Sequence, residues 1–359
     1  MKREQNAKKW FRLFLIVQLF VVLFVVVVVV VIDPYFHYHK PVEGISYRLY
    51  EERYVNDGIS RHFDYDAIIT GTSMTQNFKT SEFDALFGVK SVKEPFSGAG
   101  FEELADNLDR ALTYNENCKT VLMCLDYNGL NREYDWKQYE DYPEYLYDNN
   151  IFNDTSYVLN KAILYRGCFN NLYMTLAGIP STTFDEYSAW GSAYGFEQIM
   201  TTYTRAEEKA PMAEGLTEEE KVRVKDNIEK NILSLLEKYP DTEFLFFYSP
   251  YSILYWDSLY MEGRIQAQLE AEEMVTKMLL SYENVHLFSF FENTELICSL
   301  DKYRDKEHYI SEVNSFLLEQ MSQGNYEITA ENREDYMEFM REFYLNFDYE
   351  GFFEEQSGK

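Results

Sequence analysis

The chain has few histidines and cysteines, and it has no basic stripe beyond its first twelve residues. Five histidines and four cysteines occur in 359 residues, and no Cys-x-x-Cys pair is present, which argues against a zinc ribbon. No Walker loop or dinucleotide fingerprint occurs either. We therefore expect no metal, no cofactor and no nucleic-acid partner. A disulfide such as Cys168–Cys298 stays open from the sequence alone.

Acidic side chains dominate the composition. The 61 Asp and Glu residues outnumber 33 Lys and Arg, for a formal net charge of −28. Residues 1–12 carry +4 of their own, so the rest of the chain carries −32. A body of this charge repels nucleic acid and anionic lipid.

Residues 13–32 form a long apolar run with Gln18 as its one polar member. As a helix at about 1.5 Å per residue, it spans the hydrocarbon core of a bilayer. No small-residue cleavage pattern follows, which favours an uncleaved anchor over a signal peptide, and the run is too uniformly apolar for an ordinary core helix. The cations of residues 1–12 predict a cytoplasmic N-terminus. Residues 33–359 are then expected outside the cytoplasm, in a single-pass protein of the cell membrane. His37 and His39 lie just past the run among aromatic residues, so we interpret them as part of an interfacial belt rather than a metal site.

Short apolar runs alternate with longer amphipathic ones after the anchor. The expected strands are 65–70, 88–93, 119–127, 242–250 and 284–290, and the clearest expected helices are 101–116, 216–239 and 264–282. This alternation predicts parallel βαβ units, and continuous apolar strands indicate a sheet covered on both faces. The fold class predicted is a three-layer α/β/α sandwich with a mostly parallel sheet.

The predicted organisation is one domain, 33–325, between the anchor and an acidic, aromatic C-terminal tail, 326–359. Residues 131–215 interrupt the alternation and are rich in Tyr, Asp and Asn. We interpret them as an insertion, and two roles stay open: a lid or substrate-facing element, and a cap on the sheet.

Small and polar residues follow the predicted strands, where sites form in open α/β sheets. After the first, second and third strands stand, in turn, Ser73, Gly98 with Gly100, and Asn128. Near the end of the predicted domain comes an acid–imidazole pair, Asp305 and His308. A serine hydroxyl needs a base to become a good nucleophile, and an imidazole held by a carboxylate supplies one. Glycine turns and an asparagine amide suit an oxyanion hole.

The combination resembles the SGNH/GDSL hydrolase superfamily, and most of all the membrane-anchored, exported bacterial SGNH-like proteins related to DltD and to AlgJ/AlgX. The matching stretches are GTSMTQNF, SGAG, LDYN, DKEH and the juxtamembrane DPYFHYHKP, and the likeness runs from about residue 11 to 325. The resemblance implies a flavodoxin-like SGNH hydrolase fold.

The resemblance also implies roles for single residues. Ser73 is the nucleophile, His308 the base and Asp305 its orienting partner. The backbone N–H of Ser73, Gly98 or Gly100, and Asn128 complete the oxyanion hole. Two departures exist: Thr72 replaces the aspartate of a GDS signature, and Leu-Asp-Tyr-Asn replaces G-x-N-D. The second departure leaves Asn131 as an alternative to Asn128.

The function predicted is an extracytoplasmic, membrane-tethered serine esterase or O-acyltransferase that acts on cell-surface polysaccharide through an acyl-enzyme. The resemblance implies cooperation with a membrane-bound O-acyltransferase, with a glycan or acyl ester as substrate and with membrane lipid around residues 13–32. Two alternatives stay open. One is a non-catalytic assembly or binding protein of the cell envelope on the same fold, and the other is a secreted lipase or esterase for diffusible substrates.

Overall fold

The computed structural model describes residues 2–139, 142–148 and 150–358, whose contacts divide the chain into two units. The N-terminal unit comprises Met1–Phe63 and Asp141–Thr183, and the sheet unit comprises Asp64–Glu140 and Phe184–Lys359. This division differs from the single domain 33–325 expected from the sequence. The middle of the predicted insertion belongs with the N-terminal apolar helix, whereas its two flanks belong with the sheet.

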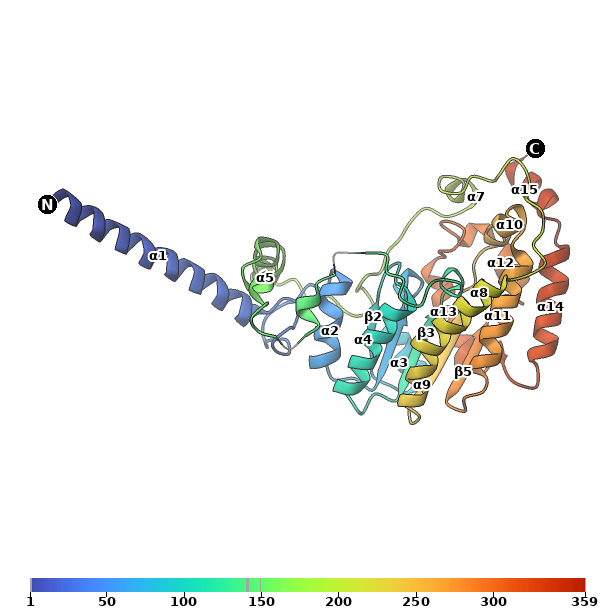
Figure 1. The fold of residues 1–359 in the computed structure, drawn as a ribbon, viewed down its shortest axis with the longest axis horizontal. Coiled ribbons are helices and arrows are strands. Elements are labelled where there is room, and N and C mark those ends of the chain that lie inside the picture. Colours follow the sequence, from blue (N-terminus) through green and yellow to red (C-terminus); the bar gives the residue numbers. More distant parts are fainter. Residues whose placement is uncertain (1, 140–141, 149, 359) are drawn as a thin grey trace. The chain divides into compact units, whose positions relative to one another are not determined.

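The sheet unit contains six strands in the order β2-β1-β3-β4-β5-β6. Their bounds are β1 Ala67–Gly71, β2 Ser91–Pro95, β3 Thr120–Leu125, β4 Glu243–Tyr248, β5 Val285–Ser289 and β6 Glu327–Ile328. The first five are parallel, and β6 is antiparallel to β5. Helices lie on both faces (Figure 1), so the predicted α/β sandwich with a mostly parallel sheet is confirmed.

The sheet forms because its strands bury side chains on both faces. All side chains of residues 121–125 in β3 are inaccessible to solvent, and those of residues 244–248 in β4 are nearly so. One pair of neighbouring helices comprises α3 (Thr80–Phe87) and α13 (Ser311–Ser322). A second series of neighbours comprises α4 (Phe101–Tyr114), α8 (Glu218–Ile228), η5 (Glu229–Leu233), α9 (Ser234–Lys238), α11 (Ile265–Leu279) and α14 (Arg333–Asn346).

The strand order fixes where the chain reverses its direction of winding. From β1 the chain moves to β2 on one side and then to β3 on the other side. In parallel α/β sheets of this order, the loops after these central strands open a crevice that serves as the ligand site. The loops that follow β1 and β3 are therefore the expected location of a ligand site.

The C-terminal residues belong to the sheet unit rather than to a separate tail. Residues 326–359 supply β6, α14 and α15 (Tyr349–Ser357), and α14 packs against α11. The inner face of α14 carries Tyr336, Met340 and Tyr344, which are almost fully buried. Burial of this much aromatic surface makes the segment part of the core.

The N-terminal unit holds the long helix α1 (Lys2–Ile32). It also contains α2 (Glu52–His62), η3 (Glu144–Leu146), α5 (Thr155–Val158), η4 (Ile163–Phe169) and α6 (Asn170–Ala177). Among the described residues, α1 is the one helix long and apolar enough to cross a membrane. The four cysteines are free thiols, with Cys118, Cys124 and Cys168 buried.

The remaining short elements belong to the sheet unit. They are η1 (Ser73–Thr75), η2 (Tyr127–Gly129), α7 (Phe196–Ile199), α10 (Ile253–Met261), α12 (Thr294–Cys298) and η6 (Leu300–Lys302). The turn η1 follows β1, and η2 follows β3, so both stand at the carboxyl edge of the sheet.

Candidate active site

Ser73 begins the tight turn η1, two residues after β1 ends at Gly71. Gly71 has a φ of +146°, and a Cβ there would lie 2.8 Å from the Cβ of Cys124. Only glycine therefore lets the chain leave β1 this close to β3. The turn is capped by Thr72, whose Oγ1 accepts the backbone N–H of Met74 at 3.4 Å.

Neighbouring elements hold the serine turn from outside. The side-chain amide of Asn314 on α13 donates to the carbonyl of Met74 at 3.1 Å. The ammonium group of the buried Lys93 donates to the carbonyls of Gln76 and Phe78 at 2.6 and 2.9 Å. These bonds fix a turn that carries the half-buried Ser73 side chain.

Asp305 and His308 lie in an irregular loop between η6 and α13. An antiparallel bridge between Tyr303 and Tyr309 closes the loop, and the N–H of Arg304 donates to the carbonyl of His308 at 2.9 Å. Asp305 and His308, three residues apart, thus project from one closed loop.

The acid–imidazole loop is tied to the end of β4. The hydroxyl of Tyr303 donates to the carbonyl of Pro250 at 2.9 Å, and Ser252 bonds the carbonyl of Lys306 through both its N–H and its hydroxyl. The loop therefore rests on the same carboxyl edge of the sheet as Ser73, although 235 residues separate Ser73 from His308 in sequence.

The structure brings Ser73, His308 and Asp305 into one hydrogen-bonded chain. The Oγ of Ser73 lies 2.7 Å from the Nε2 of His308. On the other side of the ring, Nδ1 lies 2.9 Å from both carboxylate oxygens of Asp305. A carboxylate at Nδ1 favours the tautomer with its proton there, which leaves Nε2 free to accept the serine proton.

The surroundings of the pair shift the pKa values of both His308 and Asp305. Burial alone would lower the pKa of His308, but the carboxylates of Asp305, Glu307 and Asp126 outweigh it and raise that pKa above its usual value. Burial would raise the pKa of Asp305, but hydrogen bonds from the His308 ring and from two backbone amides lower it below its usual value. Both shifts favour the charged pair, in which Asp305 is a carboxylate and His308 is an imidazolium.

Asp126 is a second carboxylate at this edge, directly after β3. Its Oδ2 accepts a 2.5 Å hydrogen bond from the hydroxyl of Thr72, the residue before the serine. Its Oδ1 is buried without a hydrogen-bond partner. Burial raises the pKa of Asp126 to about 6, against the opposing effect of the Thr72 bond. Asp126 thus links the β3 loop to the serine turn.

The residues expected to form an oxyanion hole follow the same strand ends. Gly98 and Gly100 come after β2, and Asn128 is exposed in η2 after β3. None of the three makes a hydrogen bond to Ser73 in the part of the chain that the structure describes, so their role stays a prediction. Asn131, the alternative to Asn128, instead donates to a carboxylate oxygen of Glu220 at 3.3 Å.

Gly98 and Gly100 lie against the first residues of the predicted insertion. Gly98 has a φ of +69°, and a Cβ there would collide with the side chain of Gln138. A Cβ at Gly100 would collide with the carbonyl oxygen of Trp136. Glycine is therefore favoured at Gly98 by its positive φ and required at Gly100 by the close approach of the Trp136 backbone.

Two tryptophans of the predicted insertion flank this edge, each with an arginine beside it. The Trp190 ring meets the His308 ring edge-on at 5.6 Å, and the guanidinium of Arg304 lies 5.3 Å from the Trp190 ring centre. The guanidinium of Arg132 lies 3.7 Å from the ring centre of Trp136. The backbone at Trp190 is held in place because its main-chain N–H donates to the Oδ1 of Asn77 at 2.8 Å.

Sequence reasoning assigned no role to Trp190, Arg304 or the Thr72–Asp126 bond. The composition of residues 131–215 left a substrate-facing element and a cap on the sheet both open, and no local pattern identifies Trp190 as the tryptophan that reaches His308. Asp126 was visible as a strand-end residue, yet its partner was visible only in three dimensions.

Comparisons with known proteins add one structural likeness. No family model matches the chain, and no curated protein matches it. A solved structure described as "a putative platelet activating factor from Streptococcus pneumonia" is similar over 80% of this chain and 91% of that chain. Its identity to this chain is 12% and its TM-score is 0.38.

Proposed function

We propose that the chain is a serine esterase or O-acyltransferase of the SGNH type. The observation that carries the proposal is the direct 2.7 Å contact between the hydroxyl of Ser73 and the ring of His308, with Asp305 on the opposite ring nitrogen. A non-catalytic protein has no need of a base pointed at a serine hydroxyl and a carboxylate that orients it.

The proposed reaction proceeds in two halves. His308 takes the proton of Ser73 while the serine oxygen attacks the carbonyl carbon of an ester, and the oxyanion is held by N–H groups near Ser73, Gly98 and Asn128. His308 then gives its proton to the leaving alcohol, and an acyl-serine remains. A water or a sugar hydroxyl, deprotonated by the same imidazole, releases the acyl group in the second half.

The proposed substrate is an acyl ester on a polysaccharide of the cell surface. Trp190 beside His308 and Trp136 beside the glycine loop offer aromatic faces of the kind on which sugar rings stack. Arg304 and Arg132 place positive charge next to those rings in a strongly acidic chain. Local cations of this kind offset the overall negative charge when a sugar polymer approaches.

The proposed place of action is the outer face of the cell membrane. In this proposal α1 is an uncleaved single-pass anchor, the basic residues before it stay in the cytoplasm, and the chain from Asp33 onward is on the extracytoplasmic side. A membrane-bound O-acyltransferase that delivers acyl groups across the membrane is the partner that such an arrangement would serve.

The test is the hydrolysis of para-nitrophenyl acetate by the full-length chain in detergent micelles. Ser73→Ala should lower kcat by at least about 10³-fold, because no other group in the proposed triad supplies the attacking oxygen. Ser322→Ala is the matched control, since the hydroxyl of Ser322 bonds to the carbonyl of Glu319 on its own helix, and it should retain full activity. Equal activity of the wild type and Ser73→Ala would favour the alternative, a non-catalytic envelope protein on this fold.

A further inference from the structure

The N-terminal unit contains a second stretch with an unusual composition. No acidic residue occurs between Asp154 and Asp185, although Asp and Glu make up 61 of the 359 residues. The stretch carries two cations, Lys161 and Arg166, both exposed. In a strongly acidic chain, this segment is a second stretch, after the N-terminal one, that lacks acidic side chains.

The helix formed by η4 and α6 exposes an apolar stripe. The stripe consists of side chains spaced by three or four residues on one helix face, namely Tyr165, Phe169, Tyr173 and Leu176. Their exposed fractions are 57%, 41%, 63% and 89%. The opposite face, with Ile163, Cys168 and Met174, is buried. A helix with a buried inner face is usually polar outside, so this outer face calls for a partner.

The same helix covers the end of α1. η4 and α5 pack against α1 (Figure 1), and a Cβ at Gly167 of η4 would lie 2.7 Å from the ring of Pro34, directly after α1. Val25 is the first partly buried residue of α1, and Val29 and Ile32 are buried. The apolar residues before Val25 are exposed. From Val25 to the end of α1 is a rise of about 10 Å.

The depth of this cover follows from the length of the apolar run. If residues 13–32 fill a hydrocarbon core of about 30 Å, the covered part of α1 lies within the last third of that core. Whatever packs on Val25 and Val29 must lie at the same depth. Tyr165 and Phe169 of the stripe lie on η4, the segment that packs against α1, so this end of the stripe reaches the level of the acyl chains.

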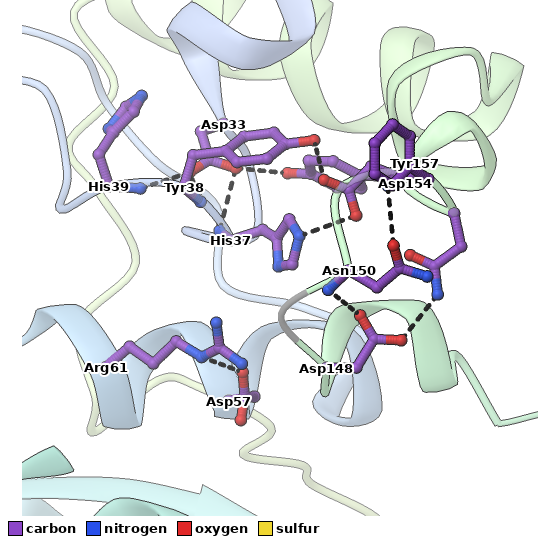
Figure 2. Close-up of polar contacts among 12 residues, drawn as sticks. Asp33, His37, Tyr38, His39, Asp57, Arg61, Asp148, Asn150, Asp154 and Tyr157 are labelled. Carbon is purple, nitrogen blue, oxygen red and sulfur yellow. Dashed lines mark hydrogen bonds and ion pairs between the residues drawn. The ribbon is translucent and has the colours of Figure 1, made fainter.

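A cluster of hydrogen bonds around Asp33 and Asp154 fixes α5 to the segment that follows α1 (Figure 2). The buried Asp33 accepts the backbone N–H groups of residues 37–39 and, at 2.7 Å, the hydroxyl of Tyr157 in α5. Asp154, just before α5, bonds the ring of His37 at 3.3 Å and the hydroxyl of Tyr38 at 2.9 Å. Carboxylates, imidazole and phenols suit the headgroup level that adjoins an apolar core.

We propose that the η4–α6 helix is embedded in the outer leaflet of the membrane that α1 spans, with its apolar stripe against lipid acyl chains and its two cations at anionic headgroups. This inference rests on the membrane anchor of the proposed function. Lipid is favoured over a protein partner because η4 packs against the helix proposed to span the membrane, and because no acidic residue occurs between Asp154 and Asp185.

The experiment uses the full-length chain in vesicles of phosphatidylcholine and phosphatidylglycerol. The photoreactive residue p-benzoylphenylalanine replaces Tyr165 or Tyr173 in the stripe, one position at a time. Phe24, exposed on α1, is the positive control for the anchor, and Tyr134, an exposed tyrosine of the sheet unit, is the negative control. Lipid adducts are counted by mass spectrometry after irradiation.

The expected result is lipid adducts at both stripe positions, at a yield close to that at Phe24 and roughly tenfold above that at Tyr134. Adducts at Phe24 without adducts at the stripe would overturn the inference and leave the anchor standing. A lack of adducts at Phe24 would remove the anchor and the inference together. Crosslinks from the stripe to a second copy of the chain, in place of lipid, would also overturn it.

Discussion

At the scale of the residue, His308 is surrounded by three carboxylates rather than one. Asp305 orients the ring, while Asp126 and Glu307 act on it through space. Each negative charge stabilises the imidazolium, so each one raises the pH at which the ring becomes a free base. In the proposed reaction, Ser73 is therefore activated only above that pH.

The pH dependence of the esterase reaction tests this arrangement. The pKa of His308 is raised, so kcat/KM should climb with pH along a limb centred above the usual histidine value. Asp126→Asn keeps an acceptor for Thr72 but removes the charge, which lowers the pKa of His308 and should move the limb to lower pH. Glu307→Gln should move it in the same direction.

The control for this prediction is Glu243→Gln. Glu243 is the first residue of β4 and lies beside His286, at the amino end of the strand. Its replacement by Gln removes the same charge, but far from the carboxyl edge of the sheet. It should leave the limb where it is. If Asp126→Asn and Glu307→Gln both leave the limb unchanged, these carboxylates do not act on the catalytic ring.

At the scale of the element, the site depends on how closely β1 approaches β3. Gly71→Ala should lower the free energy of unfolding by about 1–3 kcal/mol, because it combines a disfavoured φ with a Cβ in contact with Cys124 and Thr75. Gly88→Ala is the matched control, since its φ is also positive but its Cβ would meet no neighbouring atom. Chemical denaturation should show the larger loss at Gly71, and equal losses would mean that the close approach costs nothing.

The elements predicted from sequence are those with long apolar or helical patterns. The predicted strand 119–127 appears as β3 and 242–250 as β4, and α8 begins within the predicted helix 216–239 with a capping box of Thr217 and Glu220. The two-residue strand β6 has no pattern long enough to detect. The buried face of α14 is spaced helically at Tyr336, Met340 and Tyr344, but the charged residues Glu338, Arg341 and Glu342 between them obscure that face.

The candidate site was predictable in part for the same reason. Strand ends mark the edge where Ser73 and Asn128 stand, and the D-x-x-H spacing marks the loop. The contact of Trp190 with His308 was not predictable, because it depends on the path of a long irregular segment. The association of residues 141–183 with α1 likewise depends on tertiary contacts and on the hydrogen bonds around Asp33 and Asp154. The periodicity of the sequence does not predict such contacts.

At the scale of the whole molecule, the sequence separates charge along its length. The chain begins with a basic flank and an apolar helix, and almost all of its acidic residues follow. An uncleaved anchor predicts that the full-length chain stays with membranes after extraction with alkaline carbonate. A shorter, soluble product that begins near residue 33 would indicate a cleaved signal sequence instead.

The most direct test of the central claim is to trap the acyl-enzyme. A fluorophosphonate, which reacts with activated serines, should label the full-length chain at Ser73, as located by mass spectrometry of the labelled peptide. Labelling should be lost in Ser73→Ala and strongly slowed in His308→Ala, because the ring no longer accepts the serine proton. A wild-type chain that is labelled no faster than Ser73→Ala would contradict the account.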